Sequence, residues 1–328
     1  MTGFADFADF AEKIKEGVGK MAGAGFRIRL NDVRKNNGVM LTGITVAEND
    51  SNISPTIYLN NYYQDYVNGK TTVANVVDDV ISTYQKNKIN QFVDMRYFLN
   101  YGNVRSRIIY KLINTGKNKE LLEDIPHMEF LDLSIVFQCL VTQEDLGMAS
   151  ILIYNAHLKM WDVSVEDLYQ AAHENTKSLL RHEIKSMSEV LHELMMETPI
   201  EEYPEDFQYD VDMPELAGSV PMYVLSNKRR VEGAACMLYP DLIHDFADRI
   251  GANLFIIPSS IHELLLLPAD RDEEVPEIKC MIRDINDSQV SNEEILSYSL
   301  YFYDRQAGEI GSCNEPKFES AFAVSKSL

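Results

Sequence analysis

Helical and alternating patterns of apolar residues predict an N-terminal region that combines helices with a β-hairpin. Apolar positions recur at helical spacing in three segments, 4–22, 62–67 and 73–84. Residues 26–33 and 39–46 alternate apolar with polar side chains and flank the Asn37-Gly38 pair. Because Asn-Gly readily adopts the positive φ angles of a tight turn, these two runs predict a hairpin. Residues 53–59 can add a third strand.

A second hairpin and a long helix are expected in the middle of the chain. Residues 133–141 and 148–154 are rich in β-forming side chains and flank a mostly polar stretch. Ser164 can cap a helix with Asp167 at the capping-box position, and apolar residues at helical spacing continue to about Met196. A helix of roughly 33 residues at 1.5 Å each would span about 50 Å. We therefore expect it to bridge two halves of the molecule.

An acidic segment separates this region from the last part of the chain. From Glu197 to Glu215 there are eight acidic residues, no basic residue and three prolines, which predicts a linker or exposed loop. Six patterned segments follow, with strand-like runs at 222–225, 234–239 and 253–257, a helical pattern at 241–250, and two more segments at 262–267 and 296–304. Their order indicates a largely antiparallel sheet with helices against it.

The predicted fold class is therefore α+β, with largely antiparallel sheets, flanking helices and one long central helix. The patterns divide the chain into four regions. These are an N-terminal α+β region at 1–120, a middle hairpin plus long helix at 121–197, an acidic linker or loop at 198–218, and a C-terminal α+β region at 219–328.

Charge narrows the classes of partner. Thirty basic against 51 acidic residues leave a formal charge of −21, which repels phosphate backbones and argues against direct nucleic-acid binding and against anionic membranes. The longest aliphatic run is only Leu264–Leu267, and no signal-peptide pattern is present, so a cytoplasmic location is expected. The four cysteines have no paired spacing, and Cys139 and Cys236 lie in apolar segments where a buried thiol is expected.

Motifs for metals and nucleotides are incomplete. His173, His182, His192 and His262 each precede Glu, but none has the second histidine that a zinc-protease helix requires one turn later. Gly17-Val18-Gly19 fits a loose dinucleotide fingerprint, yet it falls in a helix and not in a strand-to-helix turn. We therefore expect no cofactor and no bound metal.

One short string carries several chemically capable side chains. Ser259, Ser260, His262 and Glu263 follow Pro258 between two apolar runs. In an extended backbone Ser260 and His262 would share a face with Cα atoms about 6.6 Å apart, as a nucleophile and its base could. The alternative is that the serines complete a turn and the His-Glu pair closes a sheet end.

Two further residues complete the candidate pocket. Asn227 is expected at a strand end, and Tyr239 directly precedes Pro240-Asp241 at a helix start. Both also have ordinary explanations, a turn for the first and a helix N-cap for the second. If the sheet brings these ends together, Asn227 and Tyr239 would share a cleft with Ser259, Ser260, His262 and Glu263.

Several strings together resemble the bacterial family DUF5688, a domain of unknown function. They are Ile125-Pro126-His127 through Phe137, Ile153-Tyr154-Asn155 with Trp161 and Glu166-Asp167-Leu168-Tyr169, Ala172-His173-Glu174-Asn175-Thr176, Tyr223-Val224-Leu225-Ser226-Asn227 with Gly233-Ala234-Ala235, and Pro258 to Pro268. The resemblance implies a shared fold and carriage on mobile elements. It supplies no established activity, so it assigns no catalytic residue.

Three functional hypotheses follow, and they leave open whether the protein is an enzyme. The first is a non-enzymatic interaction or regulatory protein whose partner is another protein. The second is a hydrolase-like enzyme that uses Ser260, His262 and Glu263. The third is an acidic mimic of nucleic acid that acts on a DNA-processing protein, with the 197–215 segment as the mimic. The sequence does not set the oligomeric state.

Overall fold

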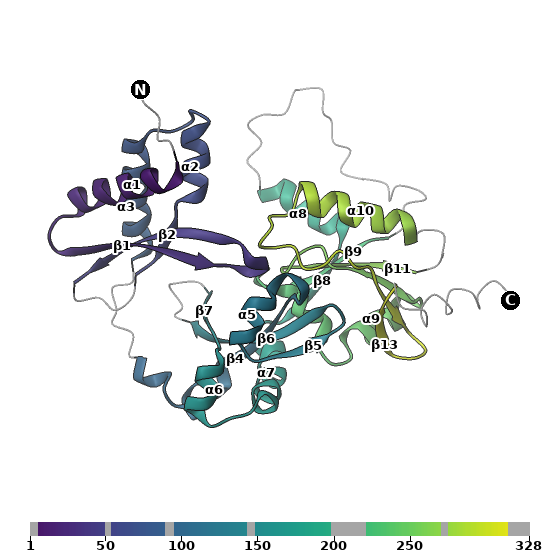
Figure 1. Ribbon diagram of the computed structural model, residues 1–328. Helices are drawn as coiled ribbons and strands as arrows, with labels where there is room; N and C mark the ends of the chain where they lie inside the picture. The colour runs from purple at the N-terminus through teal and green to yellow at the C-terminus, as the bar shows by residue number, and fades with distance from the viewer. Residues whose placement is uncertain are drawn as a thin grey trace, which may run out of the picture. The chain divides into compact units, whose positions relative to one another are not determined.

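The computed structural model describes residues 6–49, 54–88, 95–142, 148–197, 221–269 and 275–313 (Figure 1). The chain forms two compact units. The first contains residues 1–104 and 140–151, and the second contains residues 105–139 and 152–328. The acidic linker predicted at 198–218 lies outside the described residues. None of the described helices is long and apolar enough to cross a membrane.

The first unit is built on a three-stranded antiparallel sheet. Its strands β1 (Phe26–Arg34), β2 (Met40–Glu48) and β3 (Thr56–Tyr58) lie in the order β1-β2-β3. The turn between β1 and β2 places Asn37 at φ 59° and Gly38 at φ 71°, which confirms the predicted Asn-Gly hairpin. The pairing of β3 with β2 confirms the predicted third strand. The helices of this unit are α1 (Phe7–Ala22), α2 (Asn60–Val67), α3 (Val73–Asn87) and the short α4 (Tyr101–Val104).

Helix α1 packs its apolar stripe against α3 and the sheet. Phe10, Ile14 and Val18 are fully buried, in the same cluster as Val80 of α3 and Ile44 of β2. The two helices approach closely, because a Cβ atom on Gly17 would stand 2.6 Å from a methyl group of Val77. Gly17, the first glycine of the loose Gly17-Val18-Gly19 motif, therefore allows the two helices to pack closely.

The second unit begins with a small antiparallel sheet. Strands β4 (Ile108–Asn114), β6 (Leu133–Thr142) and β5 (His127–Phe130) lie in the order β4-β6-β5. The end of β6 and most of β7 (Met148–Leu152), which pairs with β6 as the predicted second hairpin, belong to residues 140–151 of the first unit. The accompanying helices are α5 (Lys119–Asp124), α6 (Asn155–Trp161) and α7 (Val165–Leu179). β4 pairs along its whole length with β6, so this sheet combines residues from both sides of position 120.

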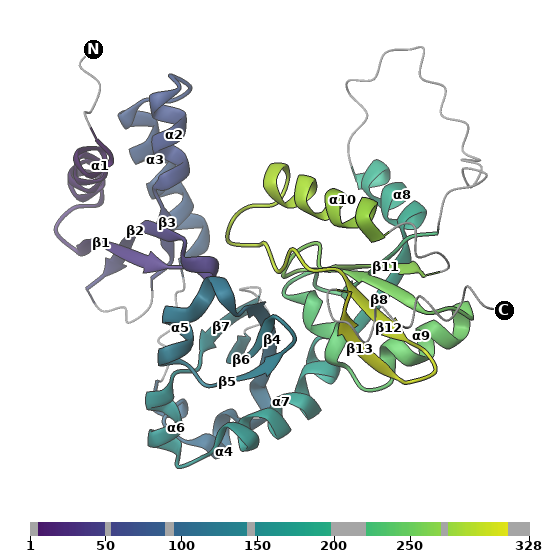
Figure 2. The same ribbon diagram turned by 45° about the vertical axis from the view of Figure 1, so that its right-hand side comes forward.

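A six-stranded antiparallel sheet occupies the rest of this unit, in the order β13-β12-β10-β11-β9-β8. Its strands are β8 (His182–Ser186), β9 (Tyr223–Asn227), β10 (Leu254–Ile257), β11 (Leu264–Pro268), β12 (Tyr301–Asp304) and β13 (Glu309–Ser312). Helices α8 (Met187–Glu197) and α10 (Val275–Ser288) cover one face, and α9 (Leu242–Ile250) covers the other (Figures 1 and 2). The α+β class with antiparallel sheets is thus confirmed.

The prediction of one long central helix is wrong. The Ser164–Asp167 capping box is present, but α7 ends at Leu179 after 15 residues, and the chain then forms β8 and the separate helix α8. The Tyr239 hydroxyl donates a hydrogen bond to the carbonyl of Leu180, the C-cap residue of α7, at 2.6 Å. A free carbonyl at a helix end needs such a partner. The chain beyond Leu180 is then available to pair with β9.

Two smaller expectations also need correction. Residues 234–239 are a 3₁₀ helix (Gly233–Leu238) and not a strand, with Cys236 buried in it. Asp241 stands at the N-cap position of α9 but has φ 61° and makes no side-chain capping bond. A left-handed residue directs its side chain away from the first turn, so α9 begins without the expected aspartate cap. Cys139 is buried in β6 as expected.

Candidate functional site

The Ser259–Glu263 string forms the tight connection between β10 and β11. The hydroxyl oxygen of Ser260 accepts a hydrogen bond from the backbone N–H of His262 at 3.0 Å, and the Ser260 N–H donates to the Glu263 carbonyl at 3.2 Å. The Ser259 N–H donates to the Ile257 carbonyl at 3.0 Å. These contacts are those of the turn alternative, in which serine side chains complete backbone hydrogen bonding.

The imidazole of His262 is held by two other segments. Its Nδ1 accepts the backbone N–H of Glu232 at 3.1 Å, and its Nε2 lies 3.5 Å from the carboxylate of Glu294. Because Nδ1 acts as an acceptor, the neutral ring carries its proton on Nε2. The ring therefore does not offer Ser260 the free basic nitrogen that a nucleophilic serine needs.

Glu232 is the centre of a buried polar cluster. Its carboxylate pairs with Lys111 Nζ at 2.8 Å and accepts the side-chain amide of Gln138, and its side chain is only 12% exposed. The residue has φ 54°, an unfavourable left-handed conformation for a side chain of this size. The ion pair and the Glu232–His262 bond therefore fix a strained loop against β4, β6 and the β10–β11 turn.

The six candidate residues divide between two places. Asn227 is buried and closes its own loop, since its side chain bonds the Val231 carbonyl at 2.7 Å and the Arg229 N–H at 3.0 Å. Ser226 donates to the His262 carbonyl at 2.7 Å, which brings the end of β9 to the Ser260–His262 turn. Tyr239 instead lines a cleft beyond this turn.

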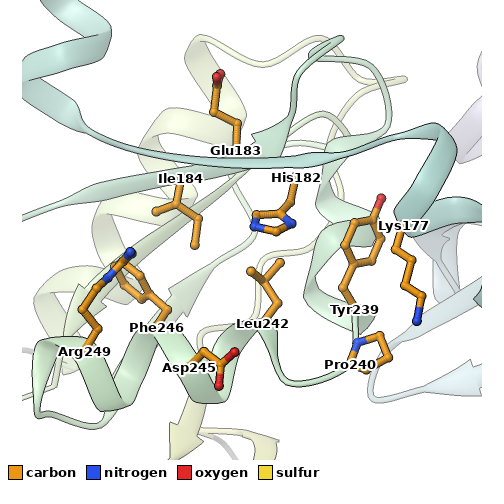
Figure 3. A pocket seen from close by; sticks show the side chains of 10 residues that line it. All are labelled: Lys177, His182, Glu183, Ile184, Tyr239, Pro240, Leu242, Asp245, Phe246 and Arg249. Carbon is orange, nitrogen blue, oxygen red and sulfur yellow. The ribbon is translucent and has the colours of Figure 1, made fainter.

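That cleft lies between β8 and α9 and has a volume of about 540 Å³ (Figure 3). Its lining residues are Lys177, His182, Glu183, Ile184, Tyr239, Pro240, Leu242, Asp245, Phe246 and Arg249. The side chains of His182 and Ile184 point from β8 toward α9, whereas Glu183 points to the opposite side of the strand, as the alternation of a β-strand requires (Figure 3). Leu242, Phe246 and Arg249 follow one another at helical spacing on α9.

The cleft contains two cations that form no ion pair with a described residue. Neither Lys177 nor Arg249 forms an ion pair with any residue that the structure describes, and the Arg249 guanidinium lies 5.0 Å from the centre of the Phe246 ring. Asp245 contributes one carboxylate, while the carboxylate of Glu183 is paired with Lys185 at 3.0 Å. The lining therefore holds two cations and two carboxylates, and the two cations form no ion pair with a described residue, although the whole chain is acidic.

His182 and Tyr239 of the lining, and the buried Cys236 next to Tyr239, are in neutral form. Partial burial, and secondarily the nearby charge of Lys228, lowers the pKa of His182 below its usual range. Burial raises the pKa of the Cys236 thiol to about 12 and raises the pKa of Tyr239 as well. At neutral pH these groups are uncharged, so the cleft presents an imidazole and a phenol ring rather than a thiolate or phenolate nucleophile.

The sequence did not identify the cleft residues His182, Lys177 and Arg249. For His182 the reason is that the pattern predicts a long helix through this position. Two local signals could have corrected it. His182, Ile184 and Ser186 alternate with charged residues, which is a strand pattern. Ser186 and Glu189 form a capping box, with Glu189 accepting the Ser186 N–H at 2.7 Å and Ser186 accepting the Glu189 N–H at 3.2 Å.

Comparison with known proteins adds a family but no activity. The family model described as "Family of unknown function (DUF5688)" matches residues 7–305. No curated protein and no solved structure matches the chain. Within the described residues, no three His, Cys, Asp or Glu side chains come together as a group that could hold a metal ion.

Proposed function

The chain belongs to the DUF5688 family, whose function is unknown, and from its own geometry we propose that the protein is a non-enzymatic interaction protein. Its binding site is the cleft between β8 and α9, and the group that it takes is anionic. The observation that carries this proposal is the pair Lys177 and Arg249, two cations without carboxylate partners among the described residues, in the concave lining of a chain with charge −21.

Charge arithmetic supports an anionic ligand. Acidic residues outnumber basic ones by 51 to 30, so a cation on this surface has many possible partners. A concave, partly apolar wall concentrates the field of the charges that line it. Arg249 stacks on Phe246, which leaves its planar N–H donors available to a carboxylate, phosphate or sulfonate group.

The contacts around the predicted nucleophile favour binding over hydrolysis. Ser260 bonds to the backbone of His262, and the His262 ring accepts from Glu232. Burial keeps Cys236, which lies next to Tyr239, in the thiol form, and the Tyr239 hydroxyl of the cleft wall is committed to the Leu180 carbonyl. These arrangements supply shape and charge to a ligand but no activated nucleophile.

Replacing Arg249 with glutamine is expected to weaken binding of naphthalene trisulfonate, an aromatic anion of fixed charge, by about 10-fold. This corresponds to about 1.4 kcal/mol for one lost charged contact. Isothermal titration calorimetry at low salt measures it. Arg283→Gln is the matched control, because Arg283 is an exposed arginine on α10 away from the cleft lining, and it should leave the affinity unchanged. Equal affinities of wild type and Arg249→Gln, or no binding to the wild type, would refute the proposed site.

Affinity for the same probe is expected to rise as the pH falls from 7.5 toward 5.5, by about threefold to tenfold. The pKa of His182 is lowered, so the ring is neutral at the start and gains a positive charge only on acidification. The charged groups around it are Lys177, Glu183, Lys228, Asp245 and Arg249. The His182→Gln variant should bind with an affinity independent of pH; a wild-type affinity that does not rise would contradict the prediction.

A further inference from the structure

Strand β8 is the last strand of the six-stranded sheet. It pairs on one side with β9, from His182↔Asn227 to Ser186↔Tyr223, and no described strand pairs with its other side. The hydrogen bonds fix which residues face β9. The Lys228 N–H donates to the Arg181 carbonyl, and the Met187 N–H donates to the Met222 carbonyl, both at 2.9 Å. In an antiparallel ladder the intervening even-numbered residues therefore direct their N–H and C=O groups outward.

The open edge is short and well defined. The outward N–H of Ser186 is taken by the carboxylate of Glu189 at 2.7 Å. The backbone N–H and C=O groups of His182 and Ile184 have no hydrogen-bond partner in the part of the chain that the structure describes. They form two donor and two acceptor positions at the rim of the cleft, and the side chains of the same two residues line it. An extended backbone laid along β8 would satisfy all four groups.

Natural sheets commonly protect such edges with a lysine, and β8 contains Lys185. This lysine does not guard the cleft side. Its ammonium is held 3.0 Å from Glu183 and 2.7 Å from Glu193 of α8, on the face of the sheet opposite α9. On the α9 face the charged side chains of the lining are the unpaired cations Lys177 and Arg249 and the carboxylate of Asp245. The edge is thus accessible from the face that carries the unpaired cations.

We propose that the partner is an extended acidic peptide segment that adds to the outer edge of β8 as a seventh strand. Alternate side chains of such a segment point to the same face, about 6.6 to 7 Å apart. Carboxylates at these positions would face the α9 side, where Arg249 and Lys177 can pair with them, while the peptide backbone bonds to His182 and Ile184. This inference rests on the proposed anion-binding function and specifies the class of ligand.

The test uses a capped octapeptide that alternates glutamate with threonine, titrated into the full chain by calorimetry. Two further peptides carry N-methyl groups, one on every glutamate and the other on every threonine, so that all three have the same charge. Adjacent residues of a strand point their N–H groups to opposite sides. We expect one methylated peptide to bind at least 10-fold more weakly than the unmodified peptide, and the other within about threefold of it.

Two further results separate this inference from the proposed function. A peptide with glutamine in place of glutamate should lose at least 10-fold in affinity, and the unmodified peptide should slow amide hydrogen exchange in the 182–186 segment. If both methylated peptides bind as well as the parent, or both lose binding equally, strand addition is refuted. Anion capture would still stand in that case if Arg249→Gln weakens binding of the trisulfonate. Failure of the wild type to bind the trisulfonate would refute the proposed function instead.

Discussion

Replacing Gly233 with alanine is expected to lower the free energy of unfolding of the second unit by about 3 kcal/mol, the largest effect that we anticipate for a single methyl group. A Cβ atom at this position would stand 2.2 Å from Ser226 Oγ, 2.4 Å from the His262 carbonyl oxygen and 2.8 Å from the Asn227 nitrogen. Two of these three neighbours are backbone atoms, which cannot turn away. The substitution must therefore break the Ser226–His262 hydrogen bond or displace the β10–β11 turn.

Urea unfolding, monitored by circular dichroism, measures this change in unfolding free energy. Gly116→Ala is the matched control in the same unit, because the nearest atom to its new methyl group would be the Asn114 side-chain oxygen at an ordinary 3.5 Å. The control should stay within about 0.5 kcal/mol of the wild type. A Gly233→Ala protein as stable as the control would show that the turn is not packed as described.

The second large effect is expected for Asp132→Ala. The Asp132 carboxylate accepts hydrogen bonds from Ser297 at 2.5 Å, Tyr301 at 2.6 Å and Ser299 at 3.1 Å. Tyr301 is completely buried, and burial followed by the Asp132 charge raises the pKa of its hydroxyl. Removing the carboxylate leaves three donors without their acceptor at the junction of the two sheets. We expect a loss of about 3 to 4 kcal/mol in unfolding free energy.

Differential scanning calorimetry and urea titration should agree on this loss. The comparison is Asp287→Ala, which removes an exposed carboxylate that accepts one hydrogen bond from Tyr298 at 2.7 Å. Since an exposed contact of this kind contributes little, that variant should lose less than about 1 kcal/mol. Similar losses for the two variants would mean that Asp132 is not the acceptor that joins the small sheet to β12.

Local sequence signals were sufficient where both partners lie within a few residues. The Asn37-Gly38 turn and the Ser164–Asp167 capping box are examples, and both structures form as predicted. The end of α7 could not be predicted in this way. Its last carbonyl is satisfied by Tyr239, 59 residues later, and a helical pattern alone does not contain that contact. The apolar spacing that continues past Leu180 fits a helix and an edge strand equally well.

The candidate site also combines local contacts, which the sequence can suggest, with long-range contacts, which it cannot. The sequence left open a Ser260–His262 side-chain pair and a turn; in the structure the Ser260 hydroxyl accepts the backbone N–H of His262, a contact of the turn. The Lys111–Glu232 pair joins residues 121 positions apart and follows no local pattern. Arg249 and Lys177 are ordinary surface residues in the sequence. Only the pairing of β8 with β9 places a cleft between them.

Ligand recognition and folding both depend on Tyr239. Its ring forms part of the cleft wall, and its hydroxyl closes the C-terminal end of α7 through the Leu180 carbonyl. A substitution that enlarged the cleft at this position would also release that helix end and favour its continuation toward β8. Selection against unstable proteins would therefore eliminate variants that broaden ligand preference by changing Tyr239. Changes in specificity are instead expected on α9 and at Lys177.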